Sequence, residues 1–342
     1  MESPDTCIEV VMANFNHARS IREAIAAINQ QTIKPQTIHV VDDCSSDESR
    51  EVLLALNKEY DNLNLIFNEA NIGAVATYEK GLSAVKSKYV YFAAADDSIF
   101  PELFSECLRL LSKYENAAFA CTSAIIVDLE TTRISMRPII QPKIVNSFMN
   151  PASVEREFRD NDNWILTGTA VYVTEMIYKE GGFVAELEAF ADSMLARKLA
   201  FKYGCVFSPY IGLKWNVSKH GFSREIFSEN NNFKKLKTIV YKYLKSEKVF
   251  PMWYQEKFMD RIDFMFFRLK FRRSQNSAII QRENGDTKEK LHMSIYQVFN
   301  LLRSFFVLKP FSLRRYLLQY IAYKTGSYRT QKISEKTSQS SG

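Results

Sequence analysis

The chain has 342 residues, of which 46% are hydrophobic and 25% charged, the balance of an ordinary globular protein. Its five cysteines are scattered without paired C-x-x-C spacing, which argues against a disulfide framework or a structural zinc site and favours a reducing compartment. The start of the sequence has no basic stretch ahead of an apolar one, and no apolar run reaches about 18 residues. We therefore expect neither a secretory signal nor a transmembrane helix.

The first 130 residues alternate between short β-branched or aromatic runs and stretches with helical spacing. Strands are expected at 8–15, 37–41, 63–67, 89–92 and 117–127. Helices are expected between them, at 20–31, 48–60, 74–86 and 101–114. This alternation predicts right-handed crossovers and an α/β fold, a doubly wound, mostly parallel sheet flanked by helices.

The pattern is less regular after residue 127. Three prolines at 138, 142 and 151 predict loops and short elements over 131–163. A strand is expected at 164–173, a turn at Gly181-Gly182-Phe183, and a helix at 191–203. Amphipathic helical stretches follow from Phe233, and the Ser/Thr/Lys-rich residues 331–342 are expected to form a disordered tail.

Polar side chains follow three of the predicted strands. They are Asn14 and Asn16 after the first strand, the pair Asp42-Asp43 after the second, and the pair Asp96-Asp97 after the fourth. In doubly wound sheets ligands bind beyond the carboxyl ends of the strands, so we expect these groups to surround one crevice.

Each aspartate pair has a structural alternative, because Asp is a good turn and helix N-cap residue. Two such pairs at strand ends are harder to explain in that way. Carboxylates held close together repel each other unless a cation offsets them, and hard oxygen ligands favour Mg²⁺ or Mn²⁺. Such an ion would bridge substrate phosphates and stabilise a departing diphosphate.

Other protein classes also place acids at strand ends. Response-regulator receivers are much smaller than this chain, and phosphoaspartyl hydrolases need Asp-x-Asp after the first strand, where this sequence has Asn14-Phe15-Asn16. The chain contains neither G-x-x-x-x-G-K-[ST] nor G-x-G-x-x-G, which disfavours ATPases and dinucleotide enzymes.

Four motifs, in order and spacing, resemble glycosyltransferase family 2: residues 10–16, residues 40–47, Asn71-Ile72-Gly73 and Ala95-Asp96-Asp97. Residues 166–172, Gly182-Phe183 and Ala191-Asp192 resemble the acceptor-side motifs of that family. The resemblance covers roughly residues 6–225. It implies the GT-A fold and inverting transfer of a sugar from a nucleotide-diphospho-sugar.

The resemblance also implies roles for individual residues. Nucleotide-sugar binding falls to Ala13, Asn14, Asn16, Asp43, Asn71, Gly73 and Asp96, with Asp43 bonding the nucleobase. Asp97 and His220 are the implied positions of the metal, Mg²⁺ or Mn²⁺. Asp192 is the implied general base that deprotonates the acceptor hydroxyl. A helix N-cap remains the alternative for Asp192, and a structural role remains the alternative for His220.

Three positions depart from the family pattern. Ala94 stands where the acidic motif commonly begins with an acid, which weakens the metal assignment. Tyr78-Glu79 replace a common Arg-Asn pair. Ala191 replaces the usual Glu before the base, which leaves Asp192 with one fewer acidic neighbour and less upward pressure on its pKa.

We divide the chain into a GT-A domain at 1–225, a basic, aromatic-rich helical region at 226–330, and the tail. The donor half of the domain covers about 1–128 and the acceptor half about 129–225. Residues 233–330 carry a net charge of +14, which leaves −8 for the rest. This region is either a helical appendage packed on the enzyme or a peripheral anchor on an anionic membrane surface. No nucleic-acid partner is expected, since no such motif occurs.

The sequence therefore predicts a cytoplasmic glycosyltransferase of polysaccharide biosynthesis, peripheral to the inner face of the cell membrane in the second of these alternatives. Its partners would be a nucleotide-diphospho-sugar donor and a glycan or lipid-linked acceptor. The alternative function is a catalytically silent nucleotide-sugar or glycan-binding module of the same fold.

Overall fold

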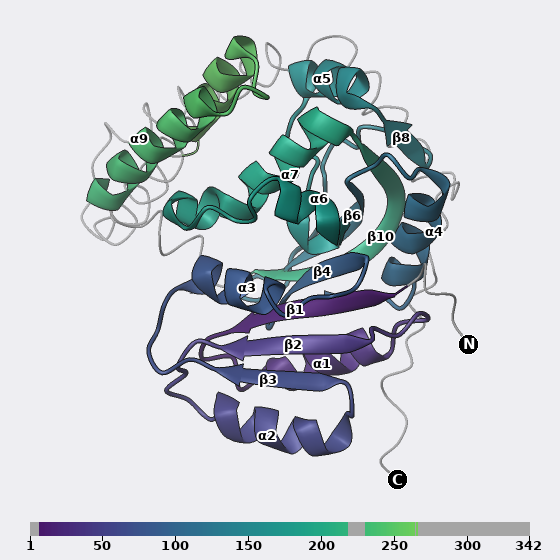
Figure 1. Cartoon of the computed structure of the whole chain (residues 1–342), viewed down its shortest axis with the longest axis vertical. Helices are drawn as coiled ribbons and strands as arrows, with labels where there is room; N and C mark the ends of the chain where they lie inside the picture. Colours follow the sequence, from purple (N-terminus) through teal and green to yellow (C-terminus); the bar gives the residue numbers. More distant parts are fainter. Residues whose placement is uncertain (1–6, 218–229, 264, 266–342) are drawn as a thin grey trace, which may run out of the picture. The chain divides into compact units, whose positions relative to one another are not determined.

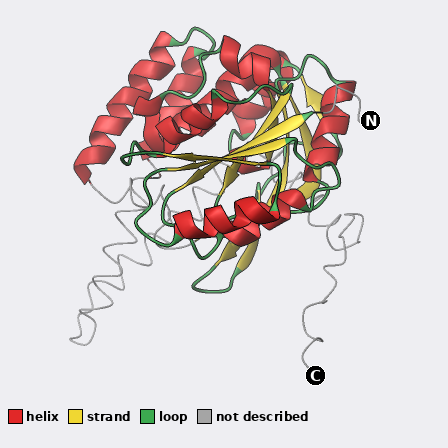
Figure 2. Cartoon of the chain, turned by 60° about the horizontal axis from the view of Figure 1, so that its bottom comes forward, coloured by secondary structure: helices red, strands yellow, loops and turns green. Residues whose placement is uncertain are grey.

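The computed structural model describes residues 7–217, 230–263 and 265, all of which belong to the compact unit Met1–Asp286. A sheet of ten strands runs through this part in the order β3-β2-β1-β4-β9-β6-β10-β5, with β7 paired to β6 and β8 to β10 (Figures 1 and 2). The strands are β1 Ile8–Asn14, β2 Thr37–Asp42, β3 Leu63–Phe67, β4 Tyr89–Ala94, β5 Ser98–Ile99, β6 Phe119–Asp128, β7 Ile134–Arg137, β8 Ser147–Met149, β9 Ala170–Val173 and β10 Cys205–Val217.

Helices flank this sheet, as the sequence predicts. The α-helices are α1 Ile21–Asn29, α2 Ser49–Glu59, α3 Ala74–Leu82, α4 Leu103–Lys113, α5 Pro151–Asp160, α6 Thr174–Lys179, α7 Ala191–Tyr203 and α9 Asn230–Ser246, and residues 252–263 are also helical. Two 3₁₀ segments, η2 Thr167–Thr169 and η3 Ala185–Phe190, lie before β9 and α7.

The first half of the sheet is parallel, and both of its faces are covered. β3, β2, β1 and β4 pair in parallel, with Ala13 of β1 opposite Val41 on one side and Ala94 on the other. Alternate residues of β1 face opposite sides, because side chains alternate along a strand. Val10 and Met12 join the hydrophobic cluster of α1, α2 and α4, whereas Val11 joins that of α3, α7 and α9. The predicted α/β architecture, with parallel strands in this half, is confirmed.

The second half differs from the prediction in three elements. β9 is antiparallel to both β4 and β6 and begins only at Ala170, not at 164. Residues Thr167–Thr169 form a 3₁₀ turn instead of a strand, because the Thr169 hydroxyl donates to the carbonyls of Leu166 and Thr122 at 2.7 and 2.9 Å. The long strand β10 and the helix α5 were not predicted. α5 nevertheless has a sequence signal, since Asn150 caps it and Pro151 occupies its first turn.

Part of the basic C-terminal region packs on the same core as α7. Phe233, Val240 and Leu244 of α9 are buried, as are Tyr254 and Phe258 of the helix that follows. Of residues 233–330, the candidate membrane anchor, only 233–263 and 265 are among the described residues. The domain boundaries and the cellular location stay predictions. In the part of the chain that the structure describes, no helix is long and apolar enough to cross a bilayer.

Candidate functional site

The ends of β1 and β2 are joined by the carboxylate of Asp42, a residue for which the sequence suggested no role. Asp42 accepts hydrogen bonds from Asn14 Nδ2 at 2.6 Å, from Ser45 N at 3.0 Å and from Ser45 Oγ at 2.6 Å. Asn16, at a φ of 58°, accepts from Ser46 N at 2.8 Å. Asn residues tolerate this left-handed conformation better than most. These bonds fix the two loops to each other, so Asn14 and Asn16 hold the loops around Asp43.

Asp43 is buried and bonded to the loop that precedes α3. Its Oδ1 accepts from Asn68 Nδ2 at 2.9 Å and from Ile72 N at 2.8 Å, and its Oδ2 accepts from Gly73 N at 2.9 Å. The structure thus brings Asp43 together with Gly73, and the Asn71 side chain also accepts from Gly73 N. A carboxylate has about four lone-pair sites, so one of them, on Oδ2, is left for a further donor.

Asp96 and Asp97 lie in the turn after β4, both half-buried. Asn216 near the end of β10 holds this turn: its backbone N–H donates to Asp97 Oδ1 at 2.9 Å, and its Nδ2 donates to the Asp96 carbonyl at 2.7 Å. The buried Oδ1 of Asn216 has no partner within the described residues. Sequence reasoning missed Asn216, because the strand that carries it was not predicted.

Burial, together with the neighbouring charge of Asp96, raises the pKa of Asp97 to about 8. A divalent cation would remove that cost by neutralising the pair. Among the described residues no three His, Cys, Asp or Glu side chains gather to hold a metal by themselves. The predicted ligand His220 lies outside the described residues. The donor set present fits Mg²⁺ or Mn²⁺ that also takes oxygen ligands from phosphates and water.

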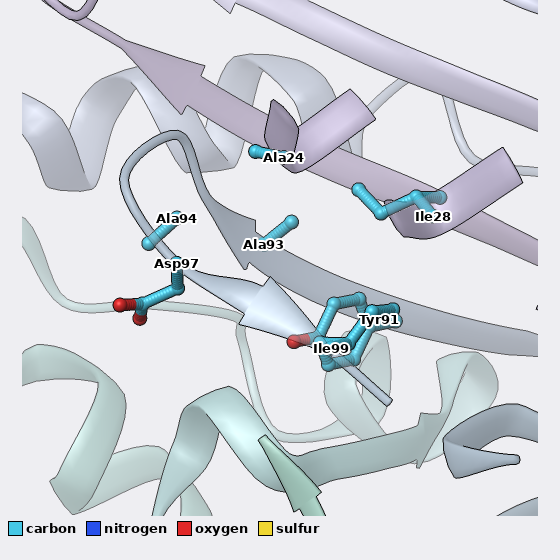
Figure 3. A pocket seen from close by; sticks show the side chains of 7 residues that line it. All are labelled: Ala24, Ile28, Tyr91, Ala93, Ala94, Asp97 and Ile99. Atoms are coloured by element: carbon cyan, nitrogen blue, oxygen red, sulfur yellow. The ribbon is translucent and has the colours of Figure 1, made fainter. Parts of the chain in front are cut away.

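A pocket of about 10 Å³, room for about one water molecule, lies beside this turn, lined by Ala24, Ile28, Tyr91, Ala93, Ala94, Asp97 and Ile99. Figure 3 shows the Asp97 carboxylate pointing away from the larger apolar side chains of this lining. The pocket is smaller than the roughly 300–1,000 Å³ of small-molecule sites. We therefore place the candidate donor site at the open strand ends and not in this pocket.

Asp192 lies in the first turn of α7 and is exposed. Its Oδ2 accepts from Thr167 Oγ1 at 2.5 Å, and its Oδ1 from Ser193 N at 2.6 Å. Crowding by the surrounding protein raises the pKa of this carboxyl, and the two hydrogen bonds and the Arg197 charge offset part of that rise. The side chain binds a backbone amide of the first turn, but Phe190 is the N-cap of α7, so Asp192 lies two positions inside the helix and is not its cap.

Tyr78 of α3 connects the two halves of the site. Its hydroxyl donates to the Ala93 carbonyl at 2.8 Å. Burial raises the pKa of Tyr78, and the charges of Asp192, Asp96 and Asp97 raise it further. Asp96 and Asp97 in the β4 turn and Asp192 in α7 therefore all lie near Tyr78.

Glu79, the second residue of the unusual Tyr78-Glu79 pair, has a structural contact. Its carboxylate accepts a hydrogen bond from Phe183 N, and it lies so close to Gly182 that a Cβ there would be 2.5 Å from Oε1. Gly182 also has a φ of 72°, a left-handed conformation that glycine adopts without strain. Glu79 thus fastens the Gly181–Phe183 turn to α3.

Residues 9–177 match the family model for Glycosyl transferase family 2. These residues belong to glycosyltransferase family 2. Among curated relatives, this family 2 chain is 30% identical over 119 residues to the cholesterol galactosyltransferase of Borreliella burgdorferi, a match covering 35% of the chain and 33% of that protein. It is 26% identical over 113 residues to the amylovoran biosynthesis glycosyltransferase AmsB of Erwinia amylovora, covering 32% and 38%. The chain therefore spans little more than a third of these relatives.

Solved structures share the fold of this family 2 chain. A mannosyltransferase of Pyrobaculum calidifontis in complex with GDP-Man and Mn²⁺ superposes with a TM-score of 0.58 at 15% identity, covering 93% of this chain and 87% of the other. S. aureus TarS 1–349 in complex with UDP-GlcNAc superposes with a TM-score of 0.55 at 15% identity, covering 70% and 66%. At these identities the likeness concerns the GT-A fold.

Proposed function

We propose that this protein transfers a sugar from a nucleotide-diphospho-sugar to a hydroxyl of a glycan or lipid-linked acceptor, with inversion. One observation carries the proposal: the charges of Asp192, Asp96 and Asp97 all act on Tyr78, so the three carboxylates lie near one side chain. A donor-side acid pair and a separate carboxylate of raised pKa thus meet at one place, as a displacement between two bound substrates requires.

On the donor side, the remaining lone pair of Asp43 can accept one N–H of a nucleobase. Phe15 and Ile72, which flank the Asp43 loops, are 44% and 49% exposed and offer apolar contact to a flat ring. Asp96 would bond the ribose or the sugar. The family match and the nucleotide sugars bound by the two structural neighbours support this placement.

Asp97 would hold a divalent metal, in a site that the diphosphate of the donor completes. When bound, the metal would neutralise the charge that develops on the departing diphosphate. The mannosyltransferase neighbour is bound to Mn²⁺, which supports this choice. Asn216 positions Asp97 for this contact through its backbone N–H.

On the acceptor side, Asp192 would take the proton of the hydroxyl as its oxygen attacks C1 from the face opposite the diphosphate. The bond from C1 to the acceptor oxygen forms while the bond from C1 to the diphosphate oxygen breaks, and the proton passes from Asp192 to solvent. A raised pKa makes a carboxylate a stronger base, which suits this step. Thr167 orients the carboxylate through Oδ2.

The proposal is tested by titrating a panel of nucleoside diphosphates and nucleotide sugars into the protein, with and without Mn²⁺. We expect one nucleotide to bind and Mn²⁺ to strengthen its binding. If no nucleotide binds, the proposal is wrong. If a nucleotide sugar binds but no product forms with any acceptor, the silent binding module becomes the better description.

A further inference from the structure

Three arginines gather next to the base-bearing helix: Arg137 at the end of β7, Arg197 in α7 and Arg261 in the helix at 252–263. We call them the arginine cluster. Burial lowers the pKa of Arg137 and of Arg261, the charges of Arg261 and Arg197 lower that of Arg137 further, and the charge of Arg197 lowers that of Arg261 further. Like charges are held close here, which is costly without an anion between them.

Two carboxylates of the described residues act on these three cations, Asp162 and Asp192. Asp162 Oδ2 accepts from Arg261 at 2.7 Å and from the Tyr254 hydroxyl at 3.2 Å, so that it is already engaged. Burial opposes the charge of Arg197, but the charges of Asp162 and Asp192 are among the influences that raise its pKa. Arg137 is left without an acidic neighbour or an ion pair in the described part of the chain.

Unused donors remain on two members of the cluster. The hydrogen bond recorded for Arg137 within the described residues is from Nη2 to Asn163 Oδ1, an amide oxygen. Arg197 is 3% exposed, and its Nε has no partner in the described part of the chain. A buried guanidinium N–H normally has a partner, because burying an unsatisfied donor is costly.

The cluster adjoins the acceptor side of the site. Arg197 lies on the same helix as Asp192, and its charge is one of the influences that lower the pKa of Asp192. Arg137 and Arg261 are half-buried, so part of each side chain is open to solvent and to a ligand. An anion held there would lie close to the hydroxyl that Asp192 deprotonates.

We propose that the arginine cluster binds an oxyanion, a phosphate or carboxylate carried by the acceptor, and so selects anionic acceptors. This inference rests on the proposed role of Asp192 on the acceptor side. The planar guanidinium presents paired N–H donors that match phosphate and carboxylate oxygens. Arg137 would contribute most, because it has the fewest contacts within the protein.

The test compares three matched small probes that share a three-carbon skeleton: glycerol, glycerate and glycerol 3-phosphate. Each is titrated by calorimetry at low salt with EDTA present, so that no metal draws the anion to the donor site. We expect one or both anions to bind and glycerol not to bind. Arg137→Gln should weaken anion binding about tenfold or more, and Arg137→Lys should be intermediate.

Arg133→Gln is the matched control, since Arg133 is an exposed arginine just before β7 and outside the cluster. If it weakens anion binding as much as Arg137→Gln, the anion is attracted by general surface charge and the proposal is wrong. Equal binding of glycerol and the two anions would also overturn it. Nucleoside diphosphate binding by Arg137→Gln, measured separately with Mn²⁺, should be unchanged. If the wild type binds no nucleotide, the glycosyltransferase proposal is wrong instead.

Discussion

The two aspartate pairs at the strand ends look alike in the sequence, but the protein treats them differently. Asp42 and Asp43 together accept six hydrogen bonds from loop amides and side chains. Among the described residues Asp97 accepts one, from Asn216, and burial raises its pKa to about 8. The first pair is bound almost fully by the protein, with one lone pair of Asp43 left for a ligand, whereas the second pair lacks a positive partner in this part of the chain.

This difference indicates two kinds of carboxylate at one edge of the sheet, one that supports the loops and one that binds a ligand. Carboxylates that receive several N–H bonds order the loops around them, whereas a half-buried, uncompensated pair is a place where a ligand gains most by binding. Asp192 belongs with the second class, since crowding by the surrounding protein raises its pKa despite two hydrogen bonds.

The largest effect is expected from Asp192→Asn. Without a base the transfer rate should fall by roughly 10²–10⁴-fold, while nucleotide affinity stays the same. Release of nucleoside diphosphate from the donor gives the rate, and calorimetry gives the affinity. Glu186→Gln, which removes an exposed acid of η3, is the control and should keep full activity. An unchanged rate in Asp192→Asn would remove this residue from the mechanism.

Asp42→Ala should lower the free energy of unfolding by about 2–4 kcal/mol, because it leaves Asn14 and Ser45 without their acceptor. Urea denaturation measures this change. Asp61→Ala, an exposed acid in the turn before β3, is the control and should stay within about 0.5 kcal/mol. If both variants are equally stable, Asp42 is not a scaffold residue.

Asp97→Asn should act in opposite directions on binding and on stability. It should weaken Mn²⁺-dependent nucleotide binding by about tenfold or more. The raised pKa means that the folded protein loses stability as pH rises from about 4, where the unfolded carboxyl ionises, to about 8. Metal-free Asp97→Asn should therefore be more stable than wild type at pH 8 and equal to it at pH 3. A variant destabilised at pH 8 would contradict the assignment.

The smallest effect is expected from Thr167→Val. A base must be ionised, so the rate should fall as pH drops through the pKa of Asp192. The Thr167 hydroxyl lowers that pKa, and its loss should move the acid limb of the pH–rate profile to higher pH. Thr169→Val would disturb the same turn through its carbonyl contacts without touching Asp192. If the acid limb of the pH–rate profile moves only in Thr169→Val, Thr167 has no direct effect on the pKa of Asp192.

The donor half could be read from the sequence because its signals are local. Each strand of β1 to β4 is a short apolar run, and each ends in polar residues whose meeting follows from parallel pairing. The second half depends on distant contacts. The curl of Thr167–Thr169 needs the Thr122 carbonyl, and Asn216 reaches Asp96 and Asp97 only because β10 runs back past β5. The different roles of Asp42 and Asp43 depend on hydrogen bonds from loop amides, which hydrophobic periodicity in the sequence does not predict.

The packing of α9 and residues 252–263 against α7 limits where such enzymes can be truncated or joined in chimeras. Phe201 of α7 lies 4.8 Å from Tyr254, centroid to centroid, and Phe190, just before that helix, lies 6.0 Å from Phe258. A fragment ending near residue 225 would expose this aromatic surface and lose the helix-to-helix support of Asp192. Chimeras that exchange acceptor preference between family members should therefore move α7 and the 230–263 segment as one cassette.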